Sequence, residues 1–354
     1  MIRFGKYVWV GLVSLAGFAA CTNSKMPAPE PEPFTVTAPA NLGTSVPAPE
    51  RNPFTREGVL LGRKLFYDPI LSGNNKISCA TCHLPEKAFS DGLALSTNGA
   101  SGQALHRSAP PLQNLAWHKG WFWDGGAKDI ESLNFGPIKH ADEMAQNLTE
   151  LVKELQNHSE YPRLFKAAFR TDTISTALLT RALAQFERTL ISANSRYDKY
   201  VRNEGGKLSS QELEGLSLFR QKCASCHATD FFTDHDYHNN GLDNTYSEAH
   251  EALAWGRGRI SEKPEDIGKY KTPTLRNIAL TAPYMHDGRF KTLEEVLDHY
   301  RSGVKVSATL DARLQQNGKT GIEMTEEEKT RIIQFLQTLT DPEFTSNPDF
   351  SAPR

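Results

Sequence analysis

The stretch CATCH at residues 79–83 decides the fold, and a second copy, CASCH, follows at residues 223–227. In a C-x-x-C-H motif the two thiols add covalently to the vinyl groups of a haem, and the adjacent imidazole binds the iron. A zinc site would usually lack a fixed histidine after each cysteine pair, and a redox disulfide would not need one. The two motifs therefore predict two covalently bound c-type haems. The attachment residues are Cys79, Cys82, His83, Cys223, Cys226 and His227.

An internal repeat surrounds the two motifs. Leu65-Phe66 precedes the first motif and Leu218-Phe219 precedes the second, so two similar units are expected. The fold class expected is all-α, with two cytochrome c-like domains that each hold one haem. A glycine pair at 205–206 divides them. The expected ranges are 51–204 for the N-terminal domain, 205–345 for the C-terminal domain and 346–354 for a tail.

Helical periodicity dominates the chain after residue 50, and no convincing alternating run of strand length appears. Apolar residues within 174–190 fall on one face of a helix that is expected to end near Ser192. Thr292 and Thr325 are each followed three residues later by glutamate, which predicts two capping boxes at helix starts.

The composition excludes several classes of protein. The chain has 354 residues, of which 23% are charged and 38% hydrophobic, so it is neither disordered nor collagen-like. Forty basic residues against forty-two acidic ones give a formal charge of −2. No overall basic field exists to hold nucleic acid.

Residues 1–20 have the pattern of a signal peptide, with two basic residues before an apolar run that is shorter than the ~20 residues a spanning helix needs. The run ends on a lipoprotein-like box in which Phe18 stands where leucine is usual and Cys21 would become the mature N-terminus. Bulky Phe18 also disfavours ordinary cleavage after Ala20, which favours a lipid anchor on Cys21. A soluble exported protein or an uncleaved anchor is the alternative. We expect a periplasmic protein, held at the outer membrane by this anchor alone.

Residues 22–50 contain seven prolines. Such a segment predicts an extended tether, at ~3.1 Å per residue in polyproline geometry, that holds the folded part away from the membrane. A disordered leader without a spacing role is the alternative.

Four further motifs lie between the two haem motifs or after them: FWDG at 122–125, GPI at 136–138 followed by Glu143-Met144, TPTLRN at 272–277 and PYMHDG at 283–288. Together with the haem motifs they resemble the bacterial dihaem cytochrome c peroxidase and MauG superfamily, from about residue 53 to about residue 340. The roles that follow are those that the resemblance implies.

The N-terminal haem would be the one that reacts with peroxide, with His83 below the iron. Glu143 matches the distal glutamate and would move the proton during cleavage of the oxygen–oxygen bond; the alternative is a solvated helix residue. Leu133 stands where the family commonly has a glutamine, which removes a hydrogen-bond donor.

Trp123 matches the tryptophan that lies between the two haems, where an indole could relay an electron; the alternative is a core aromatic residue. Arg276 would contact a haem propionate, the alternative being a surface arginine.

The second axial ligand of the C-terminal haem separates two branches of the family. Classical members use a methionine fourteen residues after the histidine of PYxHDG, and this count reaches Tyr300, the residue type that MauG uses. A phenolate stabilises oxidised iron, so Tyr300 favours an enzyme that stores two oxidising equivalents across both haems. Met285 is a rival sulfur ligand, and Tyr300 also falls at the spacing of a core face.

The backbone carbonyls of Thr281 and Pro283 match positions that hold calcium in the family, and carbonyl oxygens suit this cation. Ser108 replaces the family's asparagine ligand. The cluster at 234–238 resembles a transition-metal site, but it also matches a family loop that ends in an H-N-x-G turn.

Two other positions depart from relatives. Gln221 replaces the surface tryptophan through which MauG passes oxidation outward. His106 does not have the spacing of the histidine that blocks the first haem of classical peroxidases, so that haem is expected to be open.

The resemblance thus implies a dihaem peroxidase of the MauG-like branch. Hydrogen peroxide would oxidise the haems, which would then oxidise an external donor or a residue such as tryptophan on a partner protein. The alternatives are a classical peroxidase that takes electrons from a small cytochrome or cupredoxin, and a dihaem electron carrier without catalysis. A haem-based sensor would need a signalling domain, and none is visible.

Overall fold

The computed structural model describes residues 29–316 and 318–353. The predicted signal peptide of residues 1–20, Cys21 and the first part of the predicted tether lie outside the described residues. Within the described part, no helix has the length and apolar character needed to cross a membrane.

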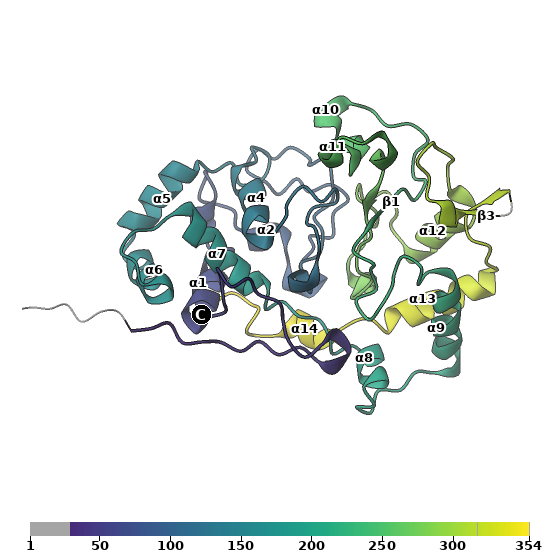
Figure 1. Cartoon of the computed structure of the whole chain (residues 1–354), viewed down its shortest axis with the longest axis horizontal. Helices are drawn as coiled ribbons and strands as arrows, with labels where there is room; N and C mark the ends of the chain where they lie inside the picture. Colours follow the sequence, from purple (N-terminus) through teal and green to yellow (C-terminus); the bar gives the residue numbers. More distant parts are fainter. Residues whose placement is uncertain (1–28, 317, 354) are drawn as a thin grey trace, which may run out of the picture.

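Two helical domains make up the body, joined by segments that cross between them (Figure 1). The α-helices and strands of the structure are α1(Arg56–Tyr67), α2(Cys79–Cys82), α3(Ile130–Leu133), α4(Phe135–Lys139), α5(Leu148–Asn157), α6(Tyr161–Phe169), α7(Thr176–Glu187), α8(Arg196–Val201), α9(Ser210–Lys222), α10(Ala249–Ala252), α11(Gly258–Ser261), α12(Leu293–Asp298), α13(Glu326–Gln337), α14(Pro342–Ser346), β1(Tyr237–His238), β2(Tyr270–Lys271), β3(Gln315–Gln316) and β4(Lys319–Thr320). Short 3₁₀ turns link them, and the π-helix η8(His299–Gly303) continues α12.

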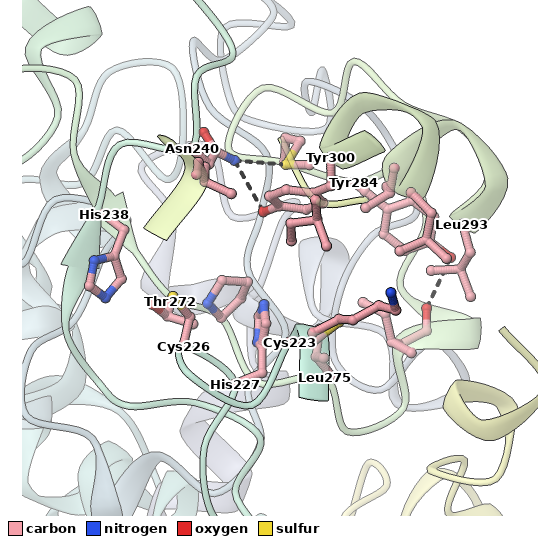
Figure 2. Close-up of a pocket in the computed structure, with 18 of the residues that line it drawn as sticks. Cys223, Cys226, His227, His238, Asn240, Thr272, Leu275, Tyr284, Leu293 and Tyr300 are labelled. Carbon is pink, nitrogen blue, oxygen red and sulfur yellow. Dashed lines mark hydrogen bonds between the residues drawn. The ribbon is translucent and has the colours of Figure 1, made fainter. Parts of the chain in front are cut away.

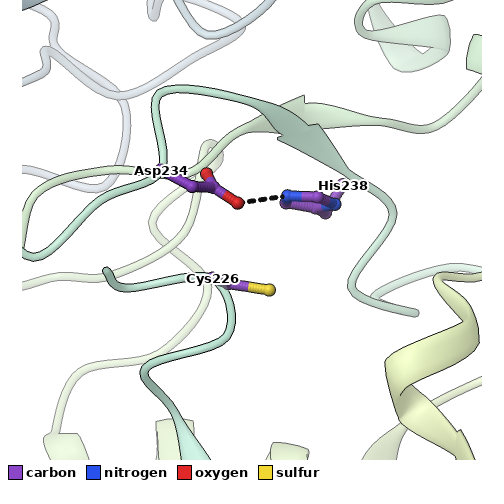
Figure 3. A group of neighbouring side chains, drawn as sticks. All are labelled: Cys226, Asp234 and His238. Atoms are coloured by element: carbon purple, nitrogen blue, oxygen red, sulfur yellow. Dashed lines mark hydrogen bonds and ion pairs between the residues drawn. The ribbon is translucent and has the colours of Figure 1, made fainter. Parts of the chain in front are cut away.

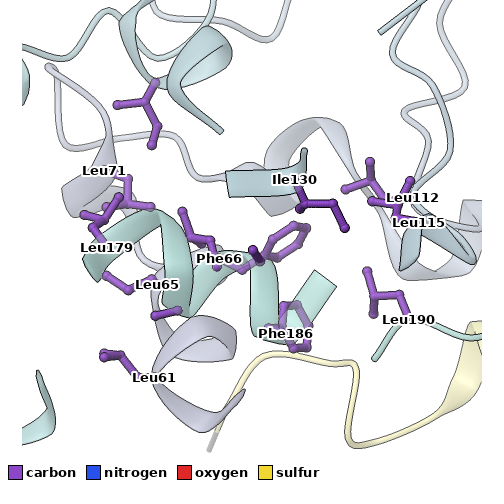
Figure 4. Close-up of a cluster of buried hydrophobic side chains, with 14 of the residues drawn as sticks. Leu61, Leu65, Phe66, Leu71, Leu112, Leu115, Ile130, Leu179, Phe186 and Leu190 are labelled. Carbon is purple, nitrogen blue, oxygen red and sulfur yellow. The ribbon is translucent and has the colours of Figure 1, made fainter. Parts of the chain in front are cut away.

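The N-terminal domain is built on the packing of α1 against α7. Thr55 caps α1 by accepting a hydrogen bond from the Gly58 amide, and Phe66 and Phe186 then pack edge to face in the core (Figure 4). Gly62 makes the close approach possible, because a Cβ atom there would lie 1.9 Å from the Ala182 carbonyl oxygen.

The C-terminal domain repeats this arrangement with α9 against α13. A Cβ atom on Gly215 would lie 2.0 Å from the Arg331 carbonyl oxygen, and Phe219 packs against Phe335. In both domains the helix before the haem motif thus packs through a glycine onto a later helix. The internal repeat in the sequence is confirmed as a structural repeat.

The predicted helix signals hold, with small differences. Both capping boxes form, at Thr292 for α12 and at Thr325 for α13. The helix expected to end near Ser192 ends at Glu187 as α7. The structure also has two antiparallel ladders of two residues per strand, β1–β2 and β3–β4, which are too short to leave a pattern in the sequence.

The domain boundaries differ from the prediction. Tyr197 on α8 packs in the core of the C-terminal domain, so the chain crosses before this residue and not near 204. The segment from residue 342 returns to the first domain, where Phe344 and Phe350 are buried in the core. The Tyr67 hydroxyl donates to the Phe350 carbonyl. Residues 346–353 are therefore part of the N-terminal domain and not a free tail.

The tether prediction is wrong for residues 29–50. This segment runs along one side of both domains (Figure 1). The Phe34 amide donates to the Phe54 carbonyl, and Leu42 is buried in a cluster that includes Trp117 and Phe231. Proline-rich sequence predicts extended backbone, but it does not predict that interspersed apolar residues will find a surface to cover.

Candidate functional site

A cavity of about 890 Å³ lies in the C-terminal domain, and the second CxxCH motif forms part of its wall (Figure 2). Cys223 caps the end of α9, so the helix places the motif at the cavity. Cys223, Cys226 and His227 line it together with Tyr300 and Met285. Two thiols, an imidazole and a cavity of this size fit a covalently attached haem.

The two motif histidines are held in the same way. His227 Nδ1 lies 3.0 Å from the Phe232 carbonyl oxygen, and His83 Nδ1 lies 2.7 Å from the Phe89 carbonyl oxygen. A carbonyl can only accept, so Nδ1 carries the proton in both rings and Nε2 keeps a free lone pair. Burial lowers the pKa of both imidazoles. Each ring is thus set in the neutral form that binds iron.

The four motif thiols are free of disulfides. Burial raises the pKa of Cys223 to about 12 and raises the pKa of Cys79 as well. The only group of three metal-ligating side chains among the described residues is Cys226, Asp234 and His238. Neither motif therefore forms a Cys-rich zinc site, which leaves haem attachment as the use that fits these thiols.

The Cys226–Asp234–His238 group is not arranged as a metal site (Figure 3). His238 Nε2 lies 2.8 Å from an Asp234 oxygen, and His238 Nδ1 lies 2.7 Å from an Asp311 oxygen. With a carboxylate at each ring nitrogen, His238 has no free lone pair to offer. The geometry therefore favours the loop interpretation of residues 234–238.

Tyr300 lies across the cavity from His227 (Figure 2), and Met285 lines the same cavity. The Asn240 side-chain amide lies 3.5 Å from the Tyr300 hydroxyl and 3.4 Å from the Met285 sulfur. Tyr300 belongs to the π-helix η8, a distortion that is frequent at functional sites. Burial raises the pKa of Tyr300 to about 12. Asn240 was not singled out from the sequence, although it lies in the H-N-x-G turn.

Glu143 lies beside the first motif. It follows α4 in a turn, outside any helix, so a solvated helix position is not what the structure has. Its carboxylate contributes, after burial, to the raised pKa of both Cys79 and Cys82. Burial also raises the pKa of Glu143 itself. Its side chain is still 34% exposed, and its Oε1 atom lies 3.9 Å from His140 Nδ1.

Trp123 lies at the interface between the domains and lines the C-terminal cavity. Its indole Nε1 donates to the Ser108 carbonyl at 3.0 Å, and its own carbonyl accepts from the Lys271 amide at 2.8 Å. Ser108 in turn donates its hydroxyl to the Met285 carbonyl at 3.1 Å. Both domains thus hold this tryptophan in place.

The surroundings of Arg276 differ from both expectations, a propionate contact and a surface position. The side chain is fully buried and makes a two-pronged ion pair with Asp198, with both N···O distances at 2.8 Å. Its remaining contacts go to the Asp230 carbonyl. It is therefore not a surface residue, and its guanidinium is used by protein groups rather than left for a propionate.

The remaining predicted residues lie as follows. Thr281, Pro283 and Ser108 share one cavity wall, but the Ser108 hydroxyl is directed to Met285. His106 is exposed and stacks on His250 with ring centroids 4.0 Å apart. Leu133 ends α3 and packs against the apolar core.

Known proteins were compared with the chain. The model of the di-haem cytochrome c peroxidase family matches residues 56–206. The methylamine utilization protein MauG of Methylorubrum extorquens is 38% identical over 83% of this chain and 81% of its own. The cytochrome c551 peroxidase of Nitrosomonas europaea is 34% identical over 83% and 81%.

A solved structure, that of a MauG-like protein associated with microbial copper homeostasis, superposes with a TM-score of 0.81 at 34% identity, and the match covers 90% of this chain and 99% of that one. The likenesses to MauG, to the cytochrome c551 peroxidase and to this solved structure cover most of the chain, whereas the family model ends at residue 206. The chain belongs to the di-haem cytochrome c peroxidase and MauG family and is an oxidoreductase that acts on peroxide.

Proposed function

We propose that this protein is a dihaem peroxidase of the MauG-like type, in which hydrogen peroxide reacts in the N-terminal domain and an external donor is oxidised. The observation that supports it most is the equivalent fixing of His83 and His227, each through Nδ1 to a backbone carbonyl. A haem in each site would supply the redox chemistry of peroxide cleavage.

Glu143 would be the acid–base residue. It has to take a proton from one peroxide oxygen and return it to the other. A carboxyl with a raised pKa suits this task, because it takes up a proton more readily than a carboxyl with the ordinary pKa. Leu133 offers no hydrogen bond to the substrate, so Glu143 would carry the proton transfer without that second donor.

Tyr300 would be the second axial ligand of the C-terminal haem, on the side opposite His227. The Asn240 amide, which donates towards the Tyr300 oxygen, would stabilise a phenolate there. Met285 makes the same contact through its sulfur and carries the classical alternative, in which a small cytochrome or a cupredoxin supplies electrons for peroxide removal.

Trp123 would couple the two domains electronically. Its indole N–H is bonded to a backbone carbonyl, which cannot take up the proton. A Trp123 that lost an electron would therefore keep this proton and regain its starting state once reduced. The partner would be either a small electron-transfer protein or a protein whose own residue, such as tryptophan, is oxidised.

Two further assignments rest on the sequence. Export to the periplasm with a lipid on Cys21 would place the enzyme at the outer membrane. A calcium ion held by the backbone carbonyls of Thr281 and Pro283 would lie at the edge of the C-terminal cavity, which both residues line.

The test is rapid mixing of the fully oxidised two-haem protein with hydrogen peroxide, with the Glu143→Gln variant as control. We expect two pyridine haemochrome equivalents per chain, a fast spectral change in the wild type and a much slower one in the variant. A protein with two haems whose spectra do not respond to peroxide would instead be an electron carrier.

A further inference from the structure

Lys271 on β2 is a partly buried cation without an acidic partner. Its Nζ atom lies 3.3 Å from His118 Nδ1 and 3.4 Å from the Gly120 carbonyl oxygen. Both contacts are neutral acceptors, and among the described residues no carboxylate forms an ion pair with this ammonium. Burial alone lowers the pKa of Lys271 to about 8. In contrast, the buried cations Arg276 and Lys329 each have an aspartate oxygen at 2.8 Å.

Two histidine side chains lie beside Lys271. His118 comes from the N-terminal domain and His235 from the C-terminal domain, with ring centroids 5.4 Å apart. Burial, followed by the charge of Lys271, lowers the pKa of both. Asp234, the acidic group that faces His235, is bonded to His238. The lowered pKa values keep both imidazoles neutral, so Lys271 is the charged group of these three side chains, and among the described residues no carboxylate forms an ion pair with it.

Lys271 is one of the residues that line the C-terminal cavity, as are Cys223 and His227. A buried charge without a counter-ion costs several kcal/mol, whereas a charge-assisted hydrogen bond to a carboxylate is among the stronger contacts in proteins. A haem carries two propionate carboxylates, and thioether bonds at Cys223 and Cys226 would fix such a haem in this cavity.

We propose that Lys271 binds a propionate carboxylate of the haem in the C-terminal cavity, with the imidazoles of His118 and His235 beside it. The inference rests on the proposed function only in that the cavity holds a haem. It transfers to Lys271 the task that the sequence had given to Arg276. An ammonium beside the haem favours the form with one more electron, so it raises the reduction potential of that haem.

The test uses the full-length protein with both haems and compares Lys271→Met with wild type by spectroelectrochemical titration. Lys305→Met is the matched control, because Lys305 is half exposed and pairs at the surface with Asp243. We expect the C-terminal haem of Lys271→Met to lose about tenfold in its reduction equilibrium constant, a fall of about 59 mV for one electron. Lys271→Arg should keep the wild-type potential, and Lys305→Met should not change it.

Two further measurements identify the anion. The redox difference infrared spectrum of the wild type should contain a carboxylate band that shifts in Lys271→Met and not in Lys305→Met. Exchanging chloride for a bulky organic anion at constant ionic strength should leave the wild-type potential unchanged. A potential that follows the chloride concentration would mean a free inorganic anion and would overturn the assignment.

The proposal and the proposed function fail separately. Equal potentials for Lys271→Met and Lys305→Met, in protein that carries two haems and reacts with peroxide, would overturn the role of Lys271 alone. Should Lys271→Met not fold, Lys271→Gln and His118→Gln provide the same comparison, and unchanged potentials in both would also refute it.

Discussion

Replacing Arg276 by methionine tests whether this arginine serves the buried ion pair with Asp198 or holds a haem. The side chains of Arg276 and Asp198 are both completely buried and joined by two N···O contacts of 2.8 Å. Removal of one partner from such a pair leaves an uncompensated buried charge and costs about 3–5 kcal/mol. An exposed pair is worth about 0–1 kcal/mol. We therefore expect Arg276→Met to lower the free energy of unfolding by about 3–5 kcal/mol.

The control is Lys199→Met, which breaks the exposed pair of Lys199 with Glu343 and should cost less than about 1 kcal/mol. A double variant, Arg276→Met with Asp198→Asn, removes the stranded carboxylate as well. Its loss in free energy of unfolding should be smaller, by about 0.5–3 kcal/mol, than the summed losses of Arg276→Met alone and Asp198→Asn alone. Urea unfolding of the two-haem protein, followed by the far-UV signal, measures these three variants and Lys199→Met.

The pH dependence gives an independent check. Although burial acts in the other direction, the Arg276 guanidinium holds the pKa of Asp198 below its ordinary value. A carboxyl with a lowered pKa in the folded state contributes stability above the ordinary value of about 3.9, and this contribution is lost as the pH falls through the folded-state value. The stability gap between wild type and Arg276→Met should therefore narrow below about pH 4. The ion-pair role would be refuted if the losses of Arg276→Met and Asp198→Asn simply added in the double variant. An Arg276→Met protein with unchanged stability and a shifted haem potential would also refute it and would restore the propionate role.

Three further outcomes are expected. Tyr300→Phe should change the low-spin haem absorption spectrum while Met285→Leu leaves it unchanged, and the reverse pattern would make Met285 the ligand. Glu143→Gln should slow the reaction with peroxide by about 10²–10⁴-fold without loss of haem, as followed by stopped-flow absorption; an equal rate would remove Glu143 from the chemistry. Gly62→Ala should destabilise the N-terminal domain by about 1–3 kcal/mol in urea, because overpacking against the Ala182 carbonyl exceeds the gain in helix propensity of ~1 kcal/mol, whereas Leu60→Ala on the exposed face of α1 should have little effect.

The parts of the site that the sequence could predict are those that sit in short motifs. The residues of a C-x-x-C-H motif are neighbours in the chain, so their meeting needs no tertiary structure. The repeat of Leu-Phe before each motif also predicted two similar units, because each pair faces the core from the helix that leads into the motif. Tyr300 and Glu143 were found by their distance from a motif. Tyr300 lines the C-terminal cavity together with His227, and the roles of both residues stay predictions.

The residues that the sequence did not predict meet across long separations. Arg276 pairs with Asp198 78 positions earlier, and nothing near either residue in the chain indicates a partner. Lys271 looks like an ordinary surface lysine before the TPTLRN motif, and only the fold encloses it with His118, 153 positions away. For the same reason the sequence did not predict that residues 29–50 pack onto the body. The apolar side chains of this segment are sparse, and the surface that they cover is made by both domains.

The groups that connect the two domains are also the groups on which coupling between the haems would depend. Trp123 is bonded through Ser108 to the Met285 loop and through its carbonyl to the Lys271 amide, so a shift of one domain against the other would move the indole relative to the cavity wall. The returning segment with Phe344 opposes such a shift. An electron relay through Trp123 would need a fixed distance, and the stability of this interface would then be part of the catalytic design. Substitutions far from either cavity that loosen the interface should slow electron exchange between the haems while each haem keeps its own spectrum.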